Sequence, residues 1–329
     1  MSNVSEINKK NLSVSFIIPV FNEMESLPFL VDYISEIQKL ISEQNLLNNY
    51  EFILIDDGSN DGSLDFVKSR LMSNKKMTKI KCAKHCRNFG YGAAIQSGIH
   101  LAKFDWVLTF DADGQHSHKS ILTILKELSN SNNAFLFIGK RTNTKMVSYR
   151  ILGRQLLNWS ENIFLGSILK DSNSGLKCFD KNIYNAIDAI IPAPDDMSFS
   201  QHIAQTFHVL SSSAVHEVPI NVNERIMGYS KIRTRDFFIA LRQNIKLAYS
   251  LKPRRFYYIL AVITFLIAAL YSFIILYINR SGMPVAGGVG LAIGSSFMVL
   301  GELRQAEREN NLKRLKSIIR KKYLLNVIN

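Results

Sequence analysis

The sequence predicts an α/β fold with an open, mostly parallel sheet, followed by a hairpin of two apolar helices. Short apolar, β-rich runs alternate with segments of helical spacing, which is the pattern of a parallel sheet whose strands are joined by helices. Several of these runs end in acidic residues, at the sheet edge where open α/β folds bind ligands. Residues 256–278 contain no charge. At about 1.5 Å per residue this run reaches about 34 Å, enough to cross a bilayer.

The first predicted unit pairs a strand with a helix. Residues 13–20 form an apolar, β-rich run typical of a buried parallel strand. Pro19 stands near its end, where the loss of one ladder donor is tolerable. After a loop at 21–23, residues 26–41 carry leucine, isoleucine and valine at helical spacing, which predicts an amphipathic helix.

The second unit repeats this design. Residues 50–55 are predicted to form a strand that ends in an acid-rich turn at 56–62. A helix that ends near Met72 follows the turn, and residues 79–83 are predicted to form the third strand.

A glycine-bearing segment precedes the next predicted helix, at 90–102. Residues 88–95 are similar to a dinucleotide-binding fingerprint, but Ile95 stands where that fingerprint needs a small residue. The segment also follows the third strand, whereas the fingerprint follows the first. We interpret the glycines beside Arg87 as allowing the backbone to approach a phosphate-bearing ligand.

The fourth predicted strand, at 106–110, leads directly into Asp111 and Asp113. The two carboxylates point the same way if the strand period of two continues to its end. Close carboxylates repel each other unless a cation or a proton intervenes, so a hard divalent metal is their expected partner, and Gln115 adds a neutral oxygen. A metal with few protein ligands keeps positions open for substrate phosphates. The alternative is a surface turn with solvated acids.

Basic residues follow the next elements. A helix is predicted at 120–129, and a strand at 135–139 leads into Arg141. Arg150 and Arg154 lie four residues apart on a predicted helix that runs to Leu169, so they share one face. Alone they would be solvated surface charges, but near a metal–phosphate site they become candidate anion ligands.

Two loops complete the globular part. Residues 171–177 form a polar loop, and residues 215–222 are predicted to form a late strand. A basic loop with a glycine follows at 224–231.

The net charge of +13 is not spread evenly along the 329 residues. Residues 1–230 carry 23 Lys and Arg and 23 Asp and Glu, whereas residues 231–255 carry 8 basic and 1 acidic residue and residues 302–329 carry 8 and 3. The basic excess therefore flanks the most apolar part of the chain. This distribution is typical of a membrane protein and argues against a nucleic-acid partner.

The cysteines and the N-terminus indicate neither a disulfide framework nor a cleaved leader. Cys82 and Cys86 are separated by three residues, which fits neither a redox motif nor a zinc motif, and Cys178 is distant in sequence. Reduced thiols in a cytoplasmic domain are expected. Residues 1–12 are predicted to form a polar tail because they lack the apolar core of a signal peptide.

The C-terminal part is predicted to be a transmembrane hairpin at 256–303. Its spans are residues 256–278 and about 285–301, and the second is short for a full crossing. Because basic residues lie outside both ends and only Arg280 lies in the turn, the positive-inside rule places the globular domain and the tail in the cytoplasm. We therefore predict a multi-pass protein of the inner (cytoplasmic) membrane. The domains are predicted to comprise the tail at 1–12, a globular domain at 13–230, a basic amphipathic juxtamembrane segment at 231–255, the hairpin and a basic tail at 304–329.

Six motifs in order, followed by two apolar runs, resemble glycosyltransferase family 2. The resemblance is to its polyprenyl-phosphate branch, which includes dolichol-phosphate mannose synthase and bacterial undecaprenyl-phosphate glycosyltransferases, and it covers about residues 13–303. The motifs are Pro19-Val-Phe-Asn-Glu23, Asp56-Asp-Gly-Ser, Arg87-Asn-Phe-Gly-Tyr-Gly, Asp111-Ala-Asp-Gly-Gln-His116, Asp171-Ser-Asn-Ser-Gly-Leu-Lys177, and Arg225 with Gly228, Ser230 and Lys231. Two positions depart from the family pattern: Gly114, where Leu is frequent, and Ser117, where Pro is frequent. Neither departure removes a ligand.

The resemblance implies a GT-A fold and transfer of a sugar from a UDP- or GDP-sugar to a polyprenyl phosphate, with Mg²⁺ or Mn²⁺ and inversion at the anomeric carbon. The implied nucleotide-sugar site comprises Pro19, Phe21, Glu23, Asp56, Asp57, Arg87 and Asp111, with Asp56 beside the base. The implied acceptor and phosphate ligands are Arg141, Arg150, Ser174, Lys177, Arg225, Ser230 and Lys231. The implied metal ligands are Asp111, Asp113 and Gln115, and the implied catalytic residues are Asp111, Asp113, Arg225 and Lys231.

The chemistry of this reaction agrees with the residues present. The leaving diphosphate gathers negative charge, which a metal and basic side chains stabilise. An acceptor phosphate is already ionised at neutral pH, so no strong general base is needed.

Two alternatives remain at this stage. Phe110-Asp-Ala-Asp-Gly also resembles the nucleophile loop of haloacid-dehalogenase-type phosphatases, although that loop usually opens its domain. The chain could also be a non-catalytic membrane adaptor that retains a relic domain. The sequence leaves open the sugar, the nucleotide, the polyprenyl length and the oligomeric state, a homo-oligomer included.

Overall fold

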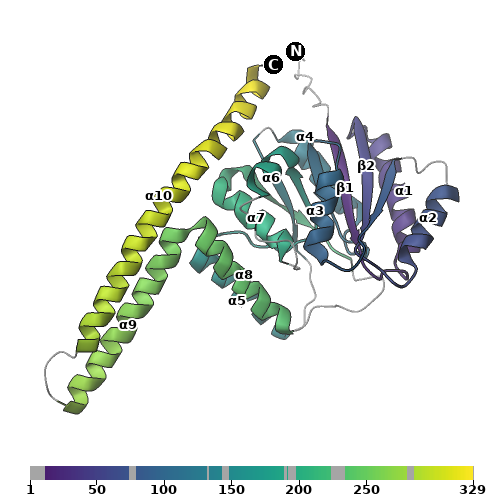
Figure 1. Cartoon of the computed structure of the whole chain (residues 1–329). Coiled ribbons are helices and arrows are strands. Elements are labelled where there is room, and N and C mark those ends of the chain that lie inside the picture. The colour runs from purple at the N-terminus through teal and green to yellow at the C-terminus, as the bar shows by residue number, and fades with distance from the viewer. Residues whose placement is uncertain are drawn as a thin grey trace. The chain divides into compact units, whose positions relative to one another are not determined.

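The structure is a computed structural model that describes residues 12–328, apart from residues 74–78, 132, 143–147, 189–190, 192–197, 224–233 and 280–284. The chain divides into two compact units, shown in Figure 1. The first comprises Met1–Arg154 with Ile168–Asp236, and the second comprises Gln155–Ser167 with Phe237–Asn329. Each unit is described separately below.

The first unit is built on a seven-stranded sheet with the strand order β3-β2-β1-β4-β6-β5-β7. Its strands are β1 (Ser13–Val20), β2 (Asn49–Asp56), β3 (Ile80–Lys84), β4 (Trp106–Thr109), β5 (Leu136–Arg141), β6 (Lys177–Asp180) and β7 (Val215–Ile220). Strands β1 to β4 run parallel, as do β5 and β7. Strand β6 pairs antiparallel with both β4 and β5. The carboxyl ends of β1, β2 and β4 therefore meet at one edge, and the loop before β6 reaches the same edge.

Helices connect these strands at the places that the sequence predicts. The helices are α1 (Leu27–Glu43), α2 (Ser63–Ser73), α3 (Tyr91–Leu101), α4 (His118–Asn130), α5 (Ser148–Leu165), α6 (Lys181–Ile187) and α7 (Phe199–Leu210). The six predicted strands and the predicted helices from α1 to α5 are confirmed, except that α5 ends at Leu165 and not at Leu169. Gly166, at φ 68°, follows the last helical residue. Strand β6 and helices α6 and α7 were not predicted. The sequence signal of β6 is weak because this strand has only four residues and begins with a lysine.

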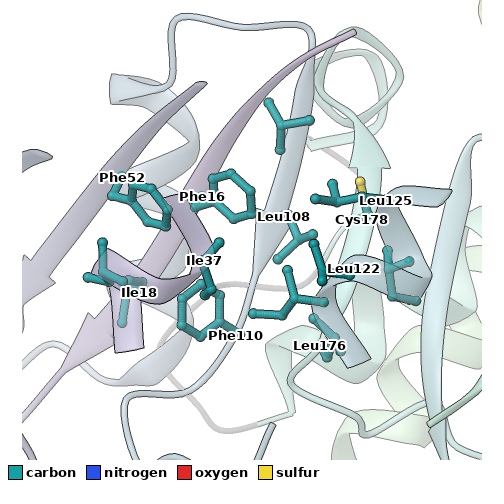
Figure 2. Packing of buried hydrophobic residues seen from close by; sticks show 14 of the residues in the cluster. Phe16, Ile18, Ile37, Phe52, Leu108, Phe110, Leu122, Leu125, Leu176 and Cys178 are labelled. Atoms are coloured by element: carbon teal, nitrogen blue, oxygen red, sulfur yellow. The ribbon is translucent and has the colours of Figure 1, made fainter. Parts of the chain in front are cut away.

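The core of the first unit lies where α1 and α4 pack on the sheet (Figure 2). Phe16 of β1 stacks on Phe52 of β2 with ring centroids 4.6 Å apart. Leu108 and Phe110 extend the same buried cluster along β4 to the edge where the acidic residues begin. Burial of each such side chain contributes about 2–3 kcal/mol to folding, so the strand ends that carry the acids are firmly held.

The second unit consists of the end of α5 with three further helices, α8 (Thr234–Leu251), α9 (Pro253–Asn279) and α10 (Val285–Ile328). Helices α9 and α10 lie side by side (Figure 1). Gly290 lies against Ala268, and Gly294 lies against the Phe265 ring, so closely that a Cβ on either glycine would clash.

Among the described residues, one helical segment, Pro253–Ile278, is long and apolar enough to cross a membrane. The second apolar run, at 285–301, is part of α10, which continues without interruption to Ile328. The sequence predicts a separate tail from residue 304, whereas the structure places most of that tail on the same helix.

Candidate functional site

The two acids of the central motif lie directly beyond β4. Asp111 and Asp113 line a small pocket together with residues of α1, among them Tyr33. The turn between β4 and α4 contains Gly114 at φ 71°, in the left-handed region that glycine adopts without strain. The structure therefore brings two of the three predicted metal ligands, Asp111 and Asp113, to one pocket, whereas Gln115 is not among its lining residues.

Asp111 is held by hydrogen bonds and by nearby positive charge. The Tyr91 hydroxyl donates to Asp111 Oδ1 at 2.9 Å, and His116 Nε2 lies 3.8 Å from Asp111 Oδ2. Burial alone would raise the pKa of Asp111, but His116, Tyr91 and the charge of Arg141 outweigh burial and lower this pKa. The Asp111 carboxylate is therefore ionised at neutral pH.

A glycine allows a second loop to approach Asp111. A Cβ on Gly175 would clash with the Asp111 carboxylate. The Thr109 hydroxyl donates to the Gly175 carbonyl at 2.8 Å, which fixes this approach. The loop before β6 thus forms one wall of the acidic site.

Asp113 is nearly buried, and Tyr33 of α1 lies close to it. Its Oδ1 accepts the backbone N–H of Gln115 at 3.1 Å. Burial and the nearby Asp113 charge raise the pKa of Tyr33, whose hydroxyl donates to the His116 carbonyl. The backbone of Gln115 is also held from the other side, because its carbonyl accepts the Asn223 N–H at 2.8 Å.

Asp56 ends β2 at the same edge and is 3 % exposed. Its Oδ1 accepts the Ser59 N–H at 2.9 Å, and Lys84 Nζ lies 3.6 Å from Oδ2. Within the part of the chain that the structure describes, the buried Oδ2 accepts no hydrogen bond. Such an oxygen is costly to leave unsatisfied, so a ligand donor at this position would be bound favourably.

Asp57 has a different environment from its neighbour. Its carboxylate accepts the N–H groups of Phe89 at 2.9 Å and Gly90 at 2.8 Å. It also bonds His85 Nδ1 at 2.7 Å, and His85 Nε2 bonds the Ser97 hydroxyl at 2.8 Å. Both Asp57 oxygens are thus engaged in holding the loop before α3. Its predicted nucleotide contact stays a prediction.

The loop after β1 carries the other predicted donor residues. Asn22 adopts φ 51°, and its backbone N–H donates to the Ser59 hydroxyl at 2.9 Å. The Glu23 carboxylate accepts the Ser26 hydroxyl at 2.8 Å. The bond from Asn22 to Ser59 joins the loop to the turn after Asp56. Pro19 and Phe21 lie beside them in sequence and are half-buried.

Arg87 is exposed on the loop before α3 and lies over the Phe89 ring, with its guanidinium carbon 4.8 Å from the ring centroid. A Cβ on Gly58, which has φ 74°, would clash with the Arg87 backbone. The turn after β2 and the Arg87 loop therefore touch through their backbones. Arg87 remains accessible to an anion.

Arg141 and the residues of the loop before β6 are held by ionic and polar contacts. Arg141 forms a two-pronged ion pair with Asp171, with N–O distances of 2.8 and 2.6 Å. Lys177 is 1 % exposed, and its amine donates to the Ser174 carbonyl and to the Ser200 hydroxyl. The buried Ser174 hydroxyl has no hydrogen-bond partner among the described residues. The predicted acceptor contacts of Ser174 and Lys177 stay predictions, and Lys177 does not reach the surface in this conformation.

Several predicted residues lie outside the part that the structure describes. Arg225, Ser230 and Lys231 fall in residues 224–233, and the Arg150 side chain is likewise not described.

Comparison with known proteins gives the family. A family model described as "Glycosyl transferase family 2" matches residues 15–186, which include the Asp56 turn and the Asp111–Asp113 pair. The chain belongs to glycosyl transferase family 2. This membership removes the haloacid-dehalogenase-type alternative, and it places the acidic strand ends within the matched domain.

Curated relatives of this family-2 chain carry one description. An undecaprenyl-phosphate 4-deoxy-4-formamido-L-arabinose transferase of Aeromonas hydrophila is 30% identical over 66% of the chain and 62% of that protein. The protein of the same description from Proteus mirabilis is 28% identical over 92% of the chain and 86% of that protein. The match to the former thus spans less than two thirds of the relative.

Solved structures show the fold. Glucosyl-3-phosphoglycerate synthase from Mycobacterium tuberculosis, in complex with phosphoglyceric acid, superposes with a TM-score of 0.54 at 17% identity. The match covers 76% of the present chain and 85% of the synthase chain. The same enzyme in complex with Mn²⁺, UDP-glucose and phosphoglyceric acid gives a TM-score of 0.53 at 16% identity, with the same coverage. The first unit of this family-2 chain therefore has the GT-A-like fold that the sequence predicts.

The residues present fit a divalent cation that is completed by substrate. Asp111 and Asp113 are oxygen ligands of the kind that Mg²⁺ and Mn²⁺ prefer, and they line one pocket. Among the described residues, no group of three or more His, Cys, Asp and Glu side chains is placed to hold a metal alone. Further oxygens from a bound diphosphate would be needed.

Three residues near Asp111 were missed by the sequence analysis. Tyr91, His116 and Gly175 lie in the quoted motifs but received no role. These three residues lie near Asp111 because α3, the loop before β6 and the turn after β4 pack together. The sequence feature that could have identified these three residues is their position in the quoted motifs.

Proposed function

We propose that this chain is a membrane-anchored, metal-dependent, inverting glycosyltransferase that moves a sugar from a nucleotide-diphosphate sugar to a polyprenyl phosphate. The observation that carries the proposal is the acidic edge of the sheet. The Asp111–Asp113 pair lines a pocket at the end of β4, and Asp56 presents an unsatisfied buried oxygen at the end of β2. The same edge of the sheet thus offers oxygen ligands for a metal–diphosphate complex and a hydrogen-bond acceptor for an N–H of the nucleotide base.

The donor half of the proposal assigns roles to these groups. Asp56 Oδ2 would accept a hydrogen bond from an N–H of the nucleotide base, which satisfies the oxygen that the protein leaves without one. Arg87, exposed on the adjoining loop, would contact the diphosphate. Asp57 would act indirectly, because it fixes the backbone on which Arg87 stands.

Asp111 and Asp113 would hold Mg²⁺ or Mn²⁺, which would stabilise the charge that the leaving diphosphate gathers. Tyr91 would keep Asp111 oriented, since its hydroxyl is bonded to Oδ1 at 2.9 Å. Tyr33 and α1 would exclude water from the Asp113 side of the pocket. The Mn²⁺ in the complex of the Mycobacterium tuberculosis synthase supports a divalent cation.

The acceptor half rests on the relatives and on the apolar helix. The relatives are described as undecaprenyl-phosphate transferases, and Pro253–Ile278 is long and apolar enough to span a bilayer. We place the protein in the inner membrane, with two spans and with the globular domain and the tail in the cytoplasm. The acceptor phosphate is ionised, so it can displace the diphosphate in line without a strong base, which gives inversion.

The test uses the full-length protein in detergent, a panel of UDP- and GDP-sugars, undecaprenyl phosphate and Mg²⁺ or Mn²⁺. We expect metal-dependent release of nucleoside diphosphate together with a glycosylated lipid whose anomeric configuration, read from proton coupling, is opposite to that of the donor. A product of retained configuration would contradict inversion. No product with any donor, in a protein that stays folded, would favour the membrane-adaptor alternative.

A further inference from the structure

A groove of about 570 Å³ runs along α9 in the second unit. It is lined by Lys252, Arg254, Arg255, Tyr258, Ile259, Val262, Ile263 and Gln305. All but Gln305 belong to the start of α9 or immediately precede it. At 3.6 residues per turn, residues 255, 259 and 262–263 form one stripe down the helix.

The groove is polarised along its length. Cations cluster at the end where α9 begins, and aliphatic side chains line the remainder. Val262 is 54% exposed and Ile263 is 47% exposed, so the aliphatic part opens to the surroundings. Cations are unfavourable at a helix N-terminus, because the helix dipole is positive there. A favourable interaction with the helix dipole therefore does not explain why Arg254 and Arg255 stand at this end of α9.

One cation at the basic end is held by an acid of α10. Arg254 pairs with Glu302 at 2.9 Å, and Glu302 also accepts the Tyr258 hydroxyl at 2.5 Å. The lining residues themselves include three cations and no acid. The lining of the groove is thus basic at the end where α9 begins and apolar along the remainder.

We propose that this groove binds an anionic phospholipid of the bilayer, with the phosphate at Lys252 and Arg255 and one acyl chain along Ile259, Val262 and Ile263. The proposal rests on the membrane anchoring in the proposed function. In a bilayer, an open apolar groove is filled by the most abundant lipids, so the basic end selects among headgroups by charge. Arg254 remains bonded to Glu302 and orders the groove instead of binding the lipid.

The experiment measures lipid retention on the full-length protein in detergent by native mass spectrometry, with phosphatidylglycerol or phosphatidylcholine added and no substrate present. We expect preferential retention of one phosphatidylglycerol. The double variant Lys252→Gln/Arg255→Gln should weaken this retention at least about fivefold. The matched control Arg242→Gln/Lys246→Gln removes two exposed cations of α8 that do not line the groove and should have no effect.

A second variant tests the apolar part. Val262→Trp fills the groove without changing charge, and it lies on an exposed face where the fold tolerates it. We expect it to reduce phosphatidylglycerol retention as well. Glycerol phosphate, which has no tail, should not compete.

Four outcomes would overturn the proposal: equal retention of the two lipids, equal effects of the two double variants, competition by glycerol phosphate, or displacement of phosphatidylglycerol by stoichiometric undecaprenyl phosphate. The last would assign the groove to the acceptor. Failure of the wild-type protein to partition into phosphatidylcholine–phosphatidylglycerol vesicles would overturn both this proposal and the membrane anchoring. Partition without a headgroup preference would overturn this proposal alone.

Discussion

The charge of Asp113 should be essential to activity. We expect Asp113→Asn to lower transfer about 100-fold or more, because the change keeps the shape and removes the charge that would balance a metal. Circular dichroism and the melting temperature should stay close to wild type. Asp32→Asn, an exposed change on α1, is the matched control and should retain full activity. Wild-type turnover by Asp113→Asn would contradict the metal assignment.

Asp56 should act on donor binding. Asp56→Asn keeps an oxygen for the Ser59 N–H and can replace the buried Oδ2 acceptor with a donor. We expect the Michaelis constant for the nucleotide sugar to rise about 10- to 100-fold with little change in kcat, because an interaction in the ground state is lost. Steady-state kinetics with varied donor would check this. A large fall in kcat with an unchanged Michaelis constant would assign Asp56 to the chemical step.

The Arg141–Asp171 ion pair should make stability depend on pH. Burial alone would raise the pKa of Asp171, but Arg141 outweighs burial and lowers the pKa below the ordinary value of about 3.9. The folded pKa is thus below the unfolded one. The pair therefore stabilises the protein above the unfolded pKa, and this stability is lost as the pH falls through the folded value.

We accordingly expect Asp171→Asn to lower the free energy of unfolding by about 3 kcal/mol at neutral pH, as for a largely buried pair that loses one partner. The difference from wild type should narrow towards pH 3. Denaturant unfolding at both pH values would measure it. Glu36→Gln, which breaks the exposed pair with Lys39, should change stability by less than about 1 kcal/mol. A difference for Asp171→Asn that is independent of pH would show that lost packing dominates.

At the scale of elements, the sequence predicts the parallel strands well and the reversed strand poorly. Strands β1, β2 and β4 are apolar runs of high β-propensity. The acids at the ends of β2 and β4 also mark where these two runs stop. Strand β6 is short, begins with Lys177 and is stabilised by its position between β4 and β5. Its register depends on tertiary contacts that sequence spacing does not encode.

The residues of the candidate site, like the strands, are only partly predictable from the sequence. The motifs identify Asp56, Asp111 and Asp113, because acids at strand ends meet at one edge whatever the details of packing. They do not separate Asp56, which has an unsatisfied oxygen, from Asp57, whose oxygens are bonded to the loop before α3. That distinction arises only when the loops after β2 and β3 are brought together.

The hairpin of α9 and α10 depends on close approach at small residues. We expect Gly290→Leu to separate the helices, because a Cβ there would clash with Ala268. The melting temperature in detergent should fall by several degrees. Gly288→Leu is the matched control, since a Cβ at Gly288 meets no atom within 4 Å. Equal melting temperatures for the two variants would show that this packing contributes nothing to stability.

At the scale of the whole molecule, membrane anchoring has a kinetic consequence. If the enzyme and the polyprenyl phosphate share a bilayer, the rate should follow the mole fraction of acceptor in the vesicles. Addition of inert phospholipid at constant total acceptor should then slow transfer in proportion. A short, water-soluble polyprenyl phosphate should not show this dilution. If both acceptors respond to bulk concentration alone, the enzyme takes its acceptor from solution.

Because α10 is one unbroken helix, a tilt of this helix would displace its far end sideways. Its 44 residues reach about 66 Å, whereas the hydrocarbon core of a bilayer is about 30 Å thick. If α10 crosses the bilayer as proposed, about 36 Å of the helix would project beyond the membrane as an arm. A tilt of about 20°, which is average for membrane helices, would displace the far end sideways by about 12 Å. Because a helix tilts to match its apolar length to the bilayer, this arm would convert membrane thickness into lateral position outside the membrane.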